Sequence, residues 1–531
     1  MALATIRQLL ERNAGQYEGH IAFRMRSGER FREYSFRRTA ELAARLGARL
    51  SQLGIGPGDR VAISSENRPE WAIAFLAITS MGAVAVPLDA VSPRTELLPL
   101  IEASGAAALV LSQKTAQLAE GTKLAGRVVS MEDFDHLPLA TAGCAAPGPD
   151  DLASIVYTSG TTGQPKGAML THRNMVSNAL AGASCFEIGP ADRFLSVLPL
   201  HHTFETTGGF LAAFSAGCSI TYAESLKSYS LLKDMQEVGV TIMLGVPLLY
   251  QLFFDGILRS AEEQGKGKLF AGLFSLSRFC RERLRFNVGK LLFAAVHKKF
   301  GGRIRFFVSG GAALDPELIR NFELMGFTLI QGYGLTESSP VLTACTLRAN
   351  RAGSVGRPIP GVEIRIAGTD AVGEILASGP NIMKGYYQRP DLTDKVVIGG
   401  WLYTGDLGYF DREGFLFITG RSKDIIVTGS GVNVYPEEIE TLLAKLPPVK
   451  ECCVLGLVVG EGLRKGSEEV LAVVVPKDGR GEAEVRAAVA ELNKRLTDYK
   501  RIAKLIVRKA ELPKTRLMKV KRFELRKELG L

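Results

Sequence analysis

A ten-residue run of glycines and hydroxyls, residues 158–167, constrains this chain more than any other segment. Three glycines, four hydroxyl residues and Lys166 fall within it, after an apolar run over 152–156 and before a predicted helix over 173–180. Glycine lets the backbone approach a ligand closely, while hydroxyls, amide N–H groups and an ammonium donate to phosphate oxygens. The run therefore predicts a loop that grips phosphate. The alternative is a Gly/Thr surface turn.

This loop differs from the common phosphate-binding loop of nucleotide hydrolases. That motif requires a Gly-Lys-Ser/Thr sequence opening a helix. Here Pro165 precedes the lysine and Gly167 follows it. The loop is thus predicted to serve another class of phosphate chemistry.

Short apolar, β-branched runs alternate with amphipathic helical patterns from about residue 35 to 225, which predicts parallel α/β sheets. The runs lie at 60–63, 83–86, 108–111, 154–157 and 219–222. Two later strands, 305–308 and 328–331, each end in a glycine-rich turn. Ligands of such sheets bind beyond the carboxyl ends of the strands, so these turns are expected to meet the phosphate loop in one crevice.

The 531 residues exceed what one hydrophobic core can organise, so several domains are expected. After residue 352 short strands and turns predict a small β subdomain. A charged joint at 421–424 then separates residues 1–420 from a compact α+β domain over 425–531. We predict that this joint is a domain boundary. The predicted fold class is α/β: a large domain with two α/β sheet subdomains and a small β subdomain, then a small α+β domain.

Cysteine usage and hydropathy predict a cytoplasmic location without a membrane span. Seven cysteines occur with no Cys-x-x-Cys pair, which favours a reducing compartment over disulfides or a zinc site. The N-terminus lacks a signal-peptide core. The longest uncharged run, 71–88, is interrupted by Gly82 and Pro87 and predicts a buried helix followed by a strand.

Two segments are markedly basic, although the formal net charge of the whole chain is only +10. Residues 500–528 carry twelve Lys or Arg against three acids, with few aromatic residues, which argues against single-stranded nucleic acid as a partner. Residues 255–300 are basic, aromatic and helical in pattern. They predict a helical hairpin with a solvated cationic face; the alternative is contact with acidic lipid head groups on the inner face of a membrane.

Three further positions suit nucleotide chemistry. Thr336 and Glu337 follow two glycines, and such a pair can hold a phosphate oxygen and Mg²⁺ together. Asp406, predicted on a tight turn, suits ribose hydroxyls.

His202 lies between apolar stretches, where a hydrogen-bonded packing role is the alternative to a functional one.

Together these motifs resemble the AMP-forming adenylating superfamily, over about residues 15–525, and most closely its long-chain fatty acid–CoA ligases. The resemblance rests on segments that occur in the family's order: 158–167, 198–202, 309–312, 332–337, 403–406, 420–424 and 513–522. It implies ATP-dependent activation of a fatty acid as an acyl-adenylate, then transfer to CoA. The products are acyl-CoA, AMP and pyrophosphate, and the cofactor is Mg²⁺.

The resemblance also assigns roles to single residues. The phosphate grip would come from Thr158, Ser159, Gly160, Thr161, Thr162, Gly163 and Lys166. Thr336 would touch the α-phosphate, and Glu337 would bind Mg²⁺. The adenine would be framed by Gly310, Gly311, Tyr333 and Gly334, and the ribose held by Asp406 and Arg421. His202 would line the acyl pocket or its gate.

The resemblance further implies that 421–424 is a hinge, about which the small mobile C-terminal domain alternates between two orientations. Lys519 would bridge the carboxylate and the α-phosphate during adenylation. The domain would then rotate about Lys423 and bring Gly429, Ser430 and Gly431 to CoA.

Several alternatives stay open at this point. The acceptor could be a carrier protein rather than CoA, and the acid could be aromatic or shorter. A non-catalytic nucleotide or nucleic-acid binder leaves the ordered motifs unexplained. The sequence fixes neither the acyl chain length nor the oligomeric state.

Overall fold

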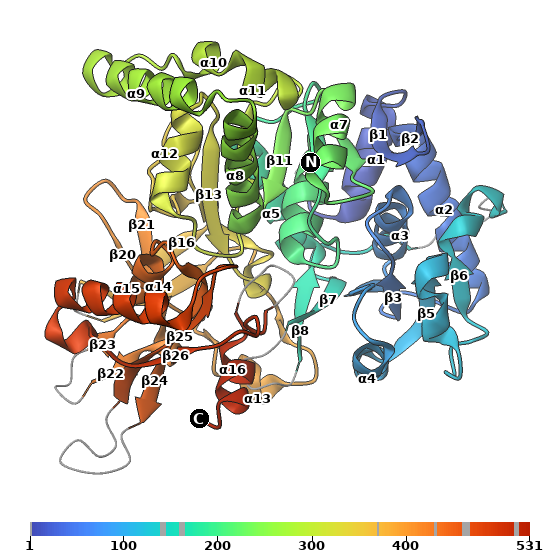
Figure 1. Cartoon of the computed structure of the whole chain (residues 1–531). Coiled ribbons are helices and arrows are strands. Elements are labelled where there is room, and N and C mark those ends of the chain that lie inside the picture. The colour runs from blue at the N-terminus through green and yellow to red at the C-terminus, as the bar shows by residue number, and fades with distance from the viewer. Residues whose placement is uncertain are drawn as a thin grey trace. The chain divides into compact units, whose positions relative to one another are not determined.

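We describe a computed structural model of the chain (Figure 1). It describes residues 3–138, 145–158, 165–368, 371–428, 433–458, 468–514 and 520–531. The described residues form two compact units, the first made of 3–158, 165–363 and 377–402 and the second of 364–376 and 403–531. Among these residues no helix is both long enough and apolar enough to cross a bilayer.

A seven-stranded sheet lies at the start of the first unit, in the order β18-β8-β7-β4-β3-β5-β6. Its strands are β3 (Arg60–Ser64), β4 (Val84–Leu88), β5 (Ala106–Leu111), β6 (Val128–Ser130), β7 (Leu152–Thr158), β8 (Lys166–Thr171) and β18 (Gly385–Tyr386). Strands β3 to β7 are parallel, whereas β8 runs antiparallel to both β7 and β18.

A nine-stranded sheet forms the second layer of this unit, in the order β15-β14-β13-β12-β11-β9-β10-β1-β2. Its strands are β1 (Ile21–Ser27), β2 (Arg30–Ser35), β9 (Arg193–Ser196), β10 (Ser219–Tyr222), β11 (Ile242–Gly245), β12 (Phe306–Ser309), β13 (Leu329–Gly334), β14 (Val341–Ala344) and β15 (Arg357–Pro358). The middle is parallel, and antiparallel pairs close both ends.

Helices accompany both sheets. They are α1 (Ile6–Gln16), α2 (Phe36–Gln52), α3 (Pro69–Ser80), α4 (Arg94–Ser104), α5 (His172–Cys185), α6 (Ala212–Ser215), α7 (Ser228–Val238), α8 (Pro247–Glu263), α9 (Gly267–Leu284), α10 (Gly289–Leu292), α11 (Ala294–Lys299), α12 (Pro316–Leu324) and α13 (Pro390–Thr393). Short η elements are η1 (Gln113–Ala119), η2 (Met131–His136), η3 (Phe204–Leu211) and η4 (Thr336–Ser338).

Helix α3 explains the long uncharged run of the sequence. It starts with Pro69 in its first turn, where a missing N–H costs nothing, and eleven of its twelve residues are buried. A helix apolar on every side is stable only inside a core. The strand β4 follows it directly, as predicted.

The second unit contains a sheet and a separate α+β layer. The sheet spans 363–378 and 397–421, of which residues 363, 377–378 and 397–402 belong to the first unit. Its strand order is β16-β17-β20-β19 with β21 beside β20: β16 (Glu363–Ile366), β17 (Gly373–Ser378), β19 (Val397–Ile398), β20 (Trp401–Phe410) and β21 (Leu416–Arg421). The layer holds η5 (Ser422–Asp424), β22 (Ile426–Val427), β23 (Asn433–Val434), α14 (Pro436–Leu443), β24 (Val449–Val458), β25 (Glu468–Pro476), α15 (Glu482–Arg495), η6 (Asp498–Lys500), β26 (Ile502–Val507) and α16 (Arg522–Glu528).

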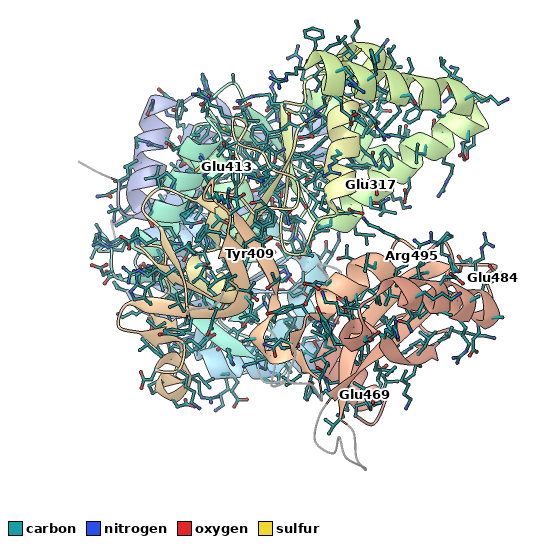
Figure 2. The ribbon with its side chains drawn as sticks, turned by 90° about the vertical axis from the view of Figure 1, so that its left-hand side faces the viewer. Glu317, Tyr409, Glu413, Glu469, Glu484 and Arg495 are labelled. Carbon is teal, nitrogen blue, oxygen red and sulfur yellow. The ribbon has the colours of Figure 1, made fainter. Side chains whose placement is uncertain are left out.

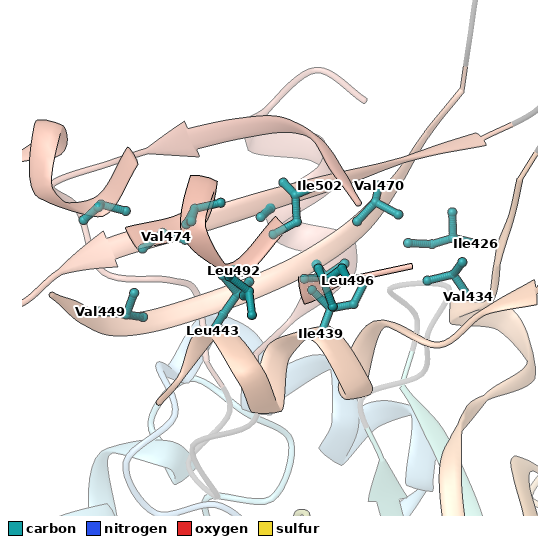
Figure 3. Close-up of a cluster of buried hydrophobic side chains, with 14 residues drawn as sticks. Ile426, Val434, Ile439, Leu443, Val449, Val470, Val474, Leu492, Leu496 and Ile502 are labelled. Carbon is teal, nitrogen blue, oxygen red and sulfur yellow. The ribbon is translucent and has the colours of Figure 1, made fainter. Parts of the chain in front are cut away.

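Helices α14 and α15 supply one side of the core of this layer. Ile439 and Leu443 of α14 and Leu492 of α15 meet the valines of β25, among them Val470 and Val474 (Figure 3). The alternation of side chains along β25 places Leu471 and Val473 in a second cluster on the other face, which Leu525 of α16 covers. Both faces of this small sheet are therefore buried.

The predicted α/β class, with a large N-terminal and a small C-terminal part, is confirmed. The predicted parallel strands form the middle of both large sheets, and antiparallel strands that were not predicted close these sheets at their edges. Asp406 was predicted on a tight turn but lies inside β20. The segment 332–334, also predicted as a turn, belongs to β13. At 332–334 the two glycines made an extended strand look like a turn, since glycine marks turns and close backbone approaches alike.

Candidate active site

The phosphate loop is the tip of a β-hairpin. Strands β7 and β8 pair antiparallel with Thr158 opposite Lys166, so the two ends of the loop are held side by side. The Thr158 hydroxyl also donates to the Lys166 carbonyl at 3.5 Å. Two residues of the predicted loop, Lys166 and Gly167, thus belong to strand β8. The loop residues Ser159, Gly160, Thr161, Thr162 and Gly163 lie outside the described residues.

Tyr386 connects Lys166 with Glu337. Its hydroxyl donates to Glu337 Oε1 at 2.7 Å, and the Lys166 ammonium lies 5.3 Å from the centroid of its ring. Strand β18 fixes this position, because Tyr386 pairs with Ala168 of β8. Burial raises the pKa of Tyr386 well above its usual value, and the Glu337 carboxylate raises it further. The hydroxyl therefore keeps its proton and serves as a donor.

Backbone bonds hold Glu337 beside β18. The Met383 amide donates to the Glu337 carbonyl at 2.8 Å. Two buried asparagines fasten the turn that follows: Asn381 donates to the Ser338 carbonyl at 2.8 Å, and Asn178 of α5 donates to the Val341 carbonyl at 2.7 Å. Glu337 is consequently placed by groups from three separate segments of the chain.

Gly334 is required by the same turn. A Cβ at this position would lie 1.8 Å from the Pro340 carbonyl oxygen, well inside van der Waals contact. The chain doubles back here, since Gly334 pairs with Val341 across the β13–β14 ladder. The turn brings Thr336 and Glu337 to the end of β13.

Gly310 and Gly311 follow β12, the strand next to β13. Ser309 pairs with Gln331 in parallel register, so the Gly310–Gly311 turn and the Gly332–Tyr333 stretch continue from neighbouring strand ends. Gly311 has φ +80°, a backbone conformation that favours glycine. The two segments therefore lie side by side, while their expected meeting with the phosphate loop in one crevice stays a prediction.

His202 lies just before the π-helical turn η3. A Cβ on Gly310 would come within 2.9 Å of the Phe204 ring, so this turn packs closely against the Gly310 backbone. The His202 ring is 4.1 Å from the His201 ring, and His201 Nδ1 is 3.8 Å from Asp89. The structure thus brings the His202 segment to the β12 strand end. A catalytic role for His202 stays a prediction.

In the second unit Asp406 and Arg421 form an ion pair. They face each other across the β20–β21 ladder, with Arg421 Nε 2.9 Å from Asp406 Oδ1. Asp406 is buried, and its backbone amide donates to the Thr404 hydroxyl oxygen at 3.1 Å. Gly405 adopts φ +73°, and its amide donates to Glu374 at 2.9 Å. Both residues were predicted to hold the ribose, and the structure pairs them with each other.

The predicted hinge residue Lys423 is exposed, whereas the next residue, Asp424, takes part in an ion pair. Asp424 lies 3.4 Å from the Arg522 guanidinium, which also binds Glu440 of α14 at 2.6 Å. Burial lowers the pKa of Arg522, but the partnering carboxylates outweigh that effect and raise it overall. Lys519, Gly429, Ser430 and Gly431 lie outside the described residues. Their roles, and the hinge at 421–424, stay predictions.

Sequence reasoning missed Tyr386, Asn178 and Asn381. None of them belongs to a recognised motif, and each acts through a contact with a residue distant in sequence.

The chain matches two protein families along most of its length. Residues 10–387 match the family described as AMP-binding enzyme, and residues 438–519 match the AMP-binding enzyme C-terminal domain. The chain belongs to the AMP-binding enzymes. The resemblance to the AMP-forming adenylating superfamily is thereby confirmed.

Similar proteins include ligases and synthases that join different acids to CoA. A long-chain-fatty-acid–CoA ligase, FadD15, of Mycobacterium bovis is 33% identical over 78% of this chain and 73% of its own. A long-chain-fatty-acid–CoA ligase of Escherichia coli O6:H1 is 30% identical over 98% and 94%. A feruloyl-CoA synthase of Amycolatopsis sp is 31% identical over 92% of both chains. Adenylation of an acid followed by transfer to CoA is consistent with these names, whereas the acid differs among them.

Solved structures show the same fold. ATP-bound MatB from Rhodopseudomonas palustris has a TM-score of 0.80 and 27% identity, and covers 98% of both chains. O-succinylbenzoate coenzyme A synthetase (MenE) from Bacillus subtilis, in complex with ATP and a magnesium ion, has a TM-score of 0.78 and 25% identity, over 98% of this chain and 99% of its own.

Proposed function

We propose that the chain is an AMP-forming fatty acid–CoA ligase acting on long-chain acids. The observation that carries the proposal is the arrangement of Lys166, Tyr386 and Glu337. The ring of Tyr386 faces the Lys166 ammonium and its hydroxyl binds the Glu337 carboxylate, beside the hairpin formed by β7 and β8. An ammonium and a metal-binding carboxylate are the two groups that a polyphosphate leaving group requires.

Glu337 fits the predicted Mg²⁺ site. Magnesium takes one or two carboxylates and completes its shell with phosphate oxygens and water. Oε1 of Glu337 accepts the Tyr386 hydroxyl, and we assign the cation to Oε2. When bound, Mg²⁺ would neutralise charge on the phosphates of ATP. A carboxylate held by a second group in this way presents its other oxygen in a fixed direction.

The residues then divide the first half-reaction among them. A carboxylate oxygen of the acid attacks the α-phosphorus of ATP, the bond to the bridging oxygen breaks, and pyrophosphate leaves. Thr158, Lys166 and the glycine-rich loop would hold the leaving group. Thr336 would donate to the α-phosphate, and Tyr333 with Gly310 and Gly311 would contact the adenine. We assign the ribose hydroxyls to Asp406.

In the second half-reaction the CoA sulfur attacks the acyl carbon, the bond to AMP breaks and the thiol proton is released. The predicted alternation of the C-terminal domain would remove Lys519 and present residues 429–431 to CoA. These assignments rest on the resemblance, since the residues concerned lie outside the described part of the chain.

Half-reactions test the assignment of Lys519. Lys519→Ala should lose adenylation of palmitate while it still converts supplied palmitoyl-AMP and CoA into palmitoyl-CoA. Lys509→Ala, an exposed lysine of the same basic region, should leave both half-reactions unchanged. Equal loss of both half-reactions in Lys519→Ala would contradict the assigned role.

Long-chain specificity is supported by the relatives named for long-chain acids, and the feruloyl-CoA synthase makes an aromatic acid the main alternative. AMP release measured with acids from acetate to oleate, and with ferulate, separates the two. The highest kcat/KM is expected for palmitate or oleate; a preference for ferulate would assign an aromatic substrate. We also propose a cytoplasmic location, which the free thiols among the described residues support.

A further inference from the structure

Helix α9 carries apolar side chains on two opposite faces. One face packs on the first unit: Phe270 and Phe274 lie 5.2 and 5.5 Å from the Phe293 ring, centroid to centroid. Polar contacts fix the same face. Ser277 donates to the Leu324 carbonyl at 2.6 Å, and Arg281 pairs with Glu323 at 2.6 Å. The helix is therefore held rigidly by residues of this face alone.

The opposite face has an exposed apolar stripe. At 100° per residue, Leu269, Leu276 and Phe279 fall within about 80° of one another and point away from the packed face. They are 60%, 47% and 56% exposed. The helix lies at the edge of the first unit, with side chains standing out on its outer side (Figures 1 and 2). Contiguous exposed apolar side chains of this size mark an interaction surface.

Three more exposed apolar residues lie at the end of α9 and after it. Leu284, Phe286 and Leu291 are 63%, 66% and 79% exposed, the last of them in α10. These residues follow the stripe in sequence and add exposed apolar area to the same stretch of the chain.

Basic residues surround the stripe. At 100° per residue Lys268 lies about 20° beyond one edge of the stripe and Arg283 falls within its arc, near the end of α9. Exposed Arg278, Arg285 and Lys290 lie nearby in sequence. Between 267 and 291 the sequence has six Lys or Arg and one acid, Glu282. An exposed apolar stripe bordered by cations is complementary to a surface that is apolar inside and negatively charged outside.

We propose that the outer face of α9, formed by Leu269, Leu276 and Phe279 with Lys268 and Arg283, binds the surface of an anionic lipid bilayer. The leucines and the phenylalanine enter the boundary between head groups and acyl chains, while the cations pair with lipid phosphates. Helix α9 lies flat on the bilayer, because its other face is already fixed to the protein. Neither ATP nor CoA takes part, so the inference is independent of the proposed catalytic function.

Vesicle flotation of the full chain tests this surface. The parent protein should float with vesicles of phosphatidylcholine and phosphatidylglycerol, and much less with phosphatidylcholine alone. Leu276→Glu with Phe279→Glu should lower the partition coefficient by on the order of tenfold or more, since each acid adds repulsion and removes apolar burial. Lys268→Glu with Arg283→Glu should lower it by a comparable factor on anionic vesicles only.

Matched variants control for non-specific effects. Leu226→Glu with Tyr229→Glu changes two exposed apolar residues elsewhere, and Lys123→Glu with Arg127→Glu changes two exposed cations. Both should bind anionic vesicles like the parent. An unchanged thermal midpoint in the α9 variants shows that they fold.

Three results would overturn the proposal. The folded α9 variants could bind like the parent, or the parent could fail to bind anionic vesicles at low salt, where the attraction is strongest. The third result would be a dimer, observed by sedimentation without lipid, that the double variant Leu276→Glu with Phe279→Glu no longer forms. That result would assign the face to a second copy of the chain.

Discussion

The hydroxyl of Tyr386 lies 2.7 Å from Glu337 Oε1, although the two residues are 49 positions apart. The same ring faces the ammonium of Lys166. One tyrosine therefore orients the carboxylate assigned to the metal and contacts the cation assigned to the phosphates. This relationship leads to two predictions.

Glu337→Gln should lower kcat for adenylation by about 10²–10³-fold. The amide can still accept the Tyr386 hydroxyl, so the turn keeps its shape while the charge that binds Mg²⁺ is lost. Pyrophosphate release measured across Mg²⁺ concentrations would show this. Glu263→Gln, at the exposed end of α8, is the control and should behave as the parent. A Glu337→Gln enzyme with unaltered Mg²⁺ dependence would argue against the metal assignment.

Tyr386→Phe should act on metal affinity rather than on the chemical step. The ring still faces Lys166, but Glu337 loses its donor, so the Mg²⁺ concentration for half-maximal rate should rise about tenfold while kcat at saturation changes little. Tyr386→Ala removes the ring as well and should also raise the KM for ATP. Equal kinetics of the two variants would show that the hydroxyl alone matters.

Gly334→Ala should displace the turn that holds Glu337. The added methyl would meet the Pro340 carbonyl oxygen at 1.8 Å, so the 335–340 backbone must move. We expect loss of most adenylation activity and a lower thermal midpoint. Gly272→Ala in α9 is the matched control: its Cβ would have no neighbour within 4 Å, so it should be neutral or stabilise by up to about 1 kcal/mol.

Glu205 should make the stability of the first unit fall as the pH rises. It is fully buried in η3, with no hydrogen-bond partner of good geometry among the described residues. Burial raises its pKa to about 8, against a smaller opposite effect of the Ser196 hydroxyl. The folded state then holds a proton that the unfolded state releases above its own pKa of about 4.5, so stability is lost progressively between pH 4.5 and 8.

Glu205→Gln tests this pH dependence, because glutamine is shaped like the protonated acid and does not ionise. Its thermal midpoint should exceed that of the parent by an amount that grows from pH 5 to pH 8. The full effect corresponds to about 4–5 kcal/mol by linkage. A difference between the two proteins that does not vary with pH would show that Glu205 is ionised in the folded chain.

Much of the fold could be predicted because local patterns decide it. The uncharged run around α3, the short strands of the second unit and the helices α14 and α15 follow from hydropathy and turn residues. The strand β8 could not be predicted in the same way. Its glycine and lysine read as loop, and only pairing with β7 and β18 makes it a strand.

The candidate site, like the fold, could be predicted only where local sequence motifs mark its residues. Glu337 and Asp406 belong to motifs, so the sequence could predict them as site residues. It could predict only some of the residues that contact them. Arg421 is close in sequence and in a motif. Tyr386, Asn178 and Asn381 act across long separations, and a single sequence carries no record of which distant residues meet.

CoA-dependent AMP release with palmitate, ATP and Mg²⁺ tests the central claim most directly. The account predicts stoichiometric formation of AMP, pyrophosphate and palmitoyl-CoA, with turnover that requires CoA and a lower kcat/KM for acetate. Turnover that ignores CoA but requires a holo carrier protein would contradict the acceptor. The absence of palmitoyl-AMP in the reaction without CoA would contradict the mechanism itself.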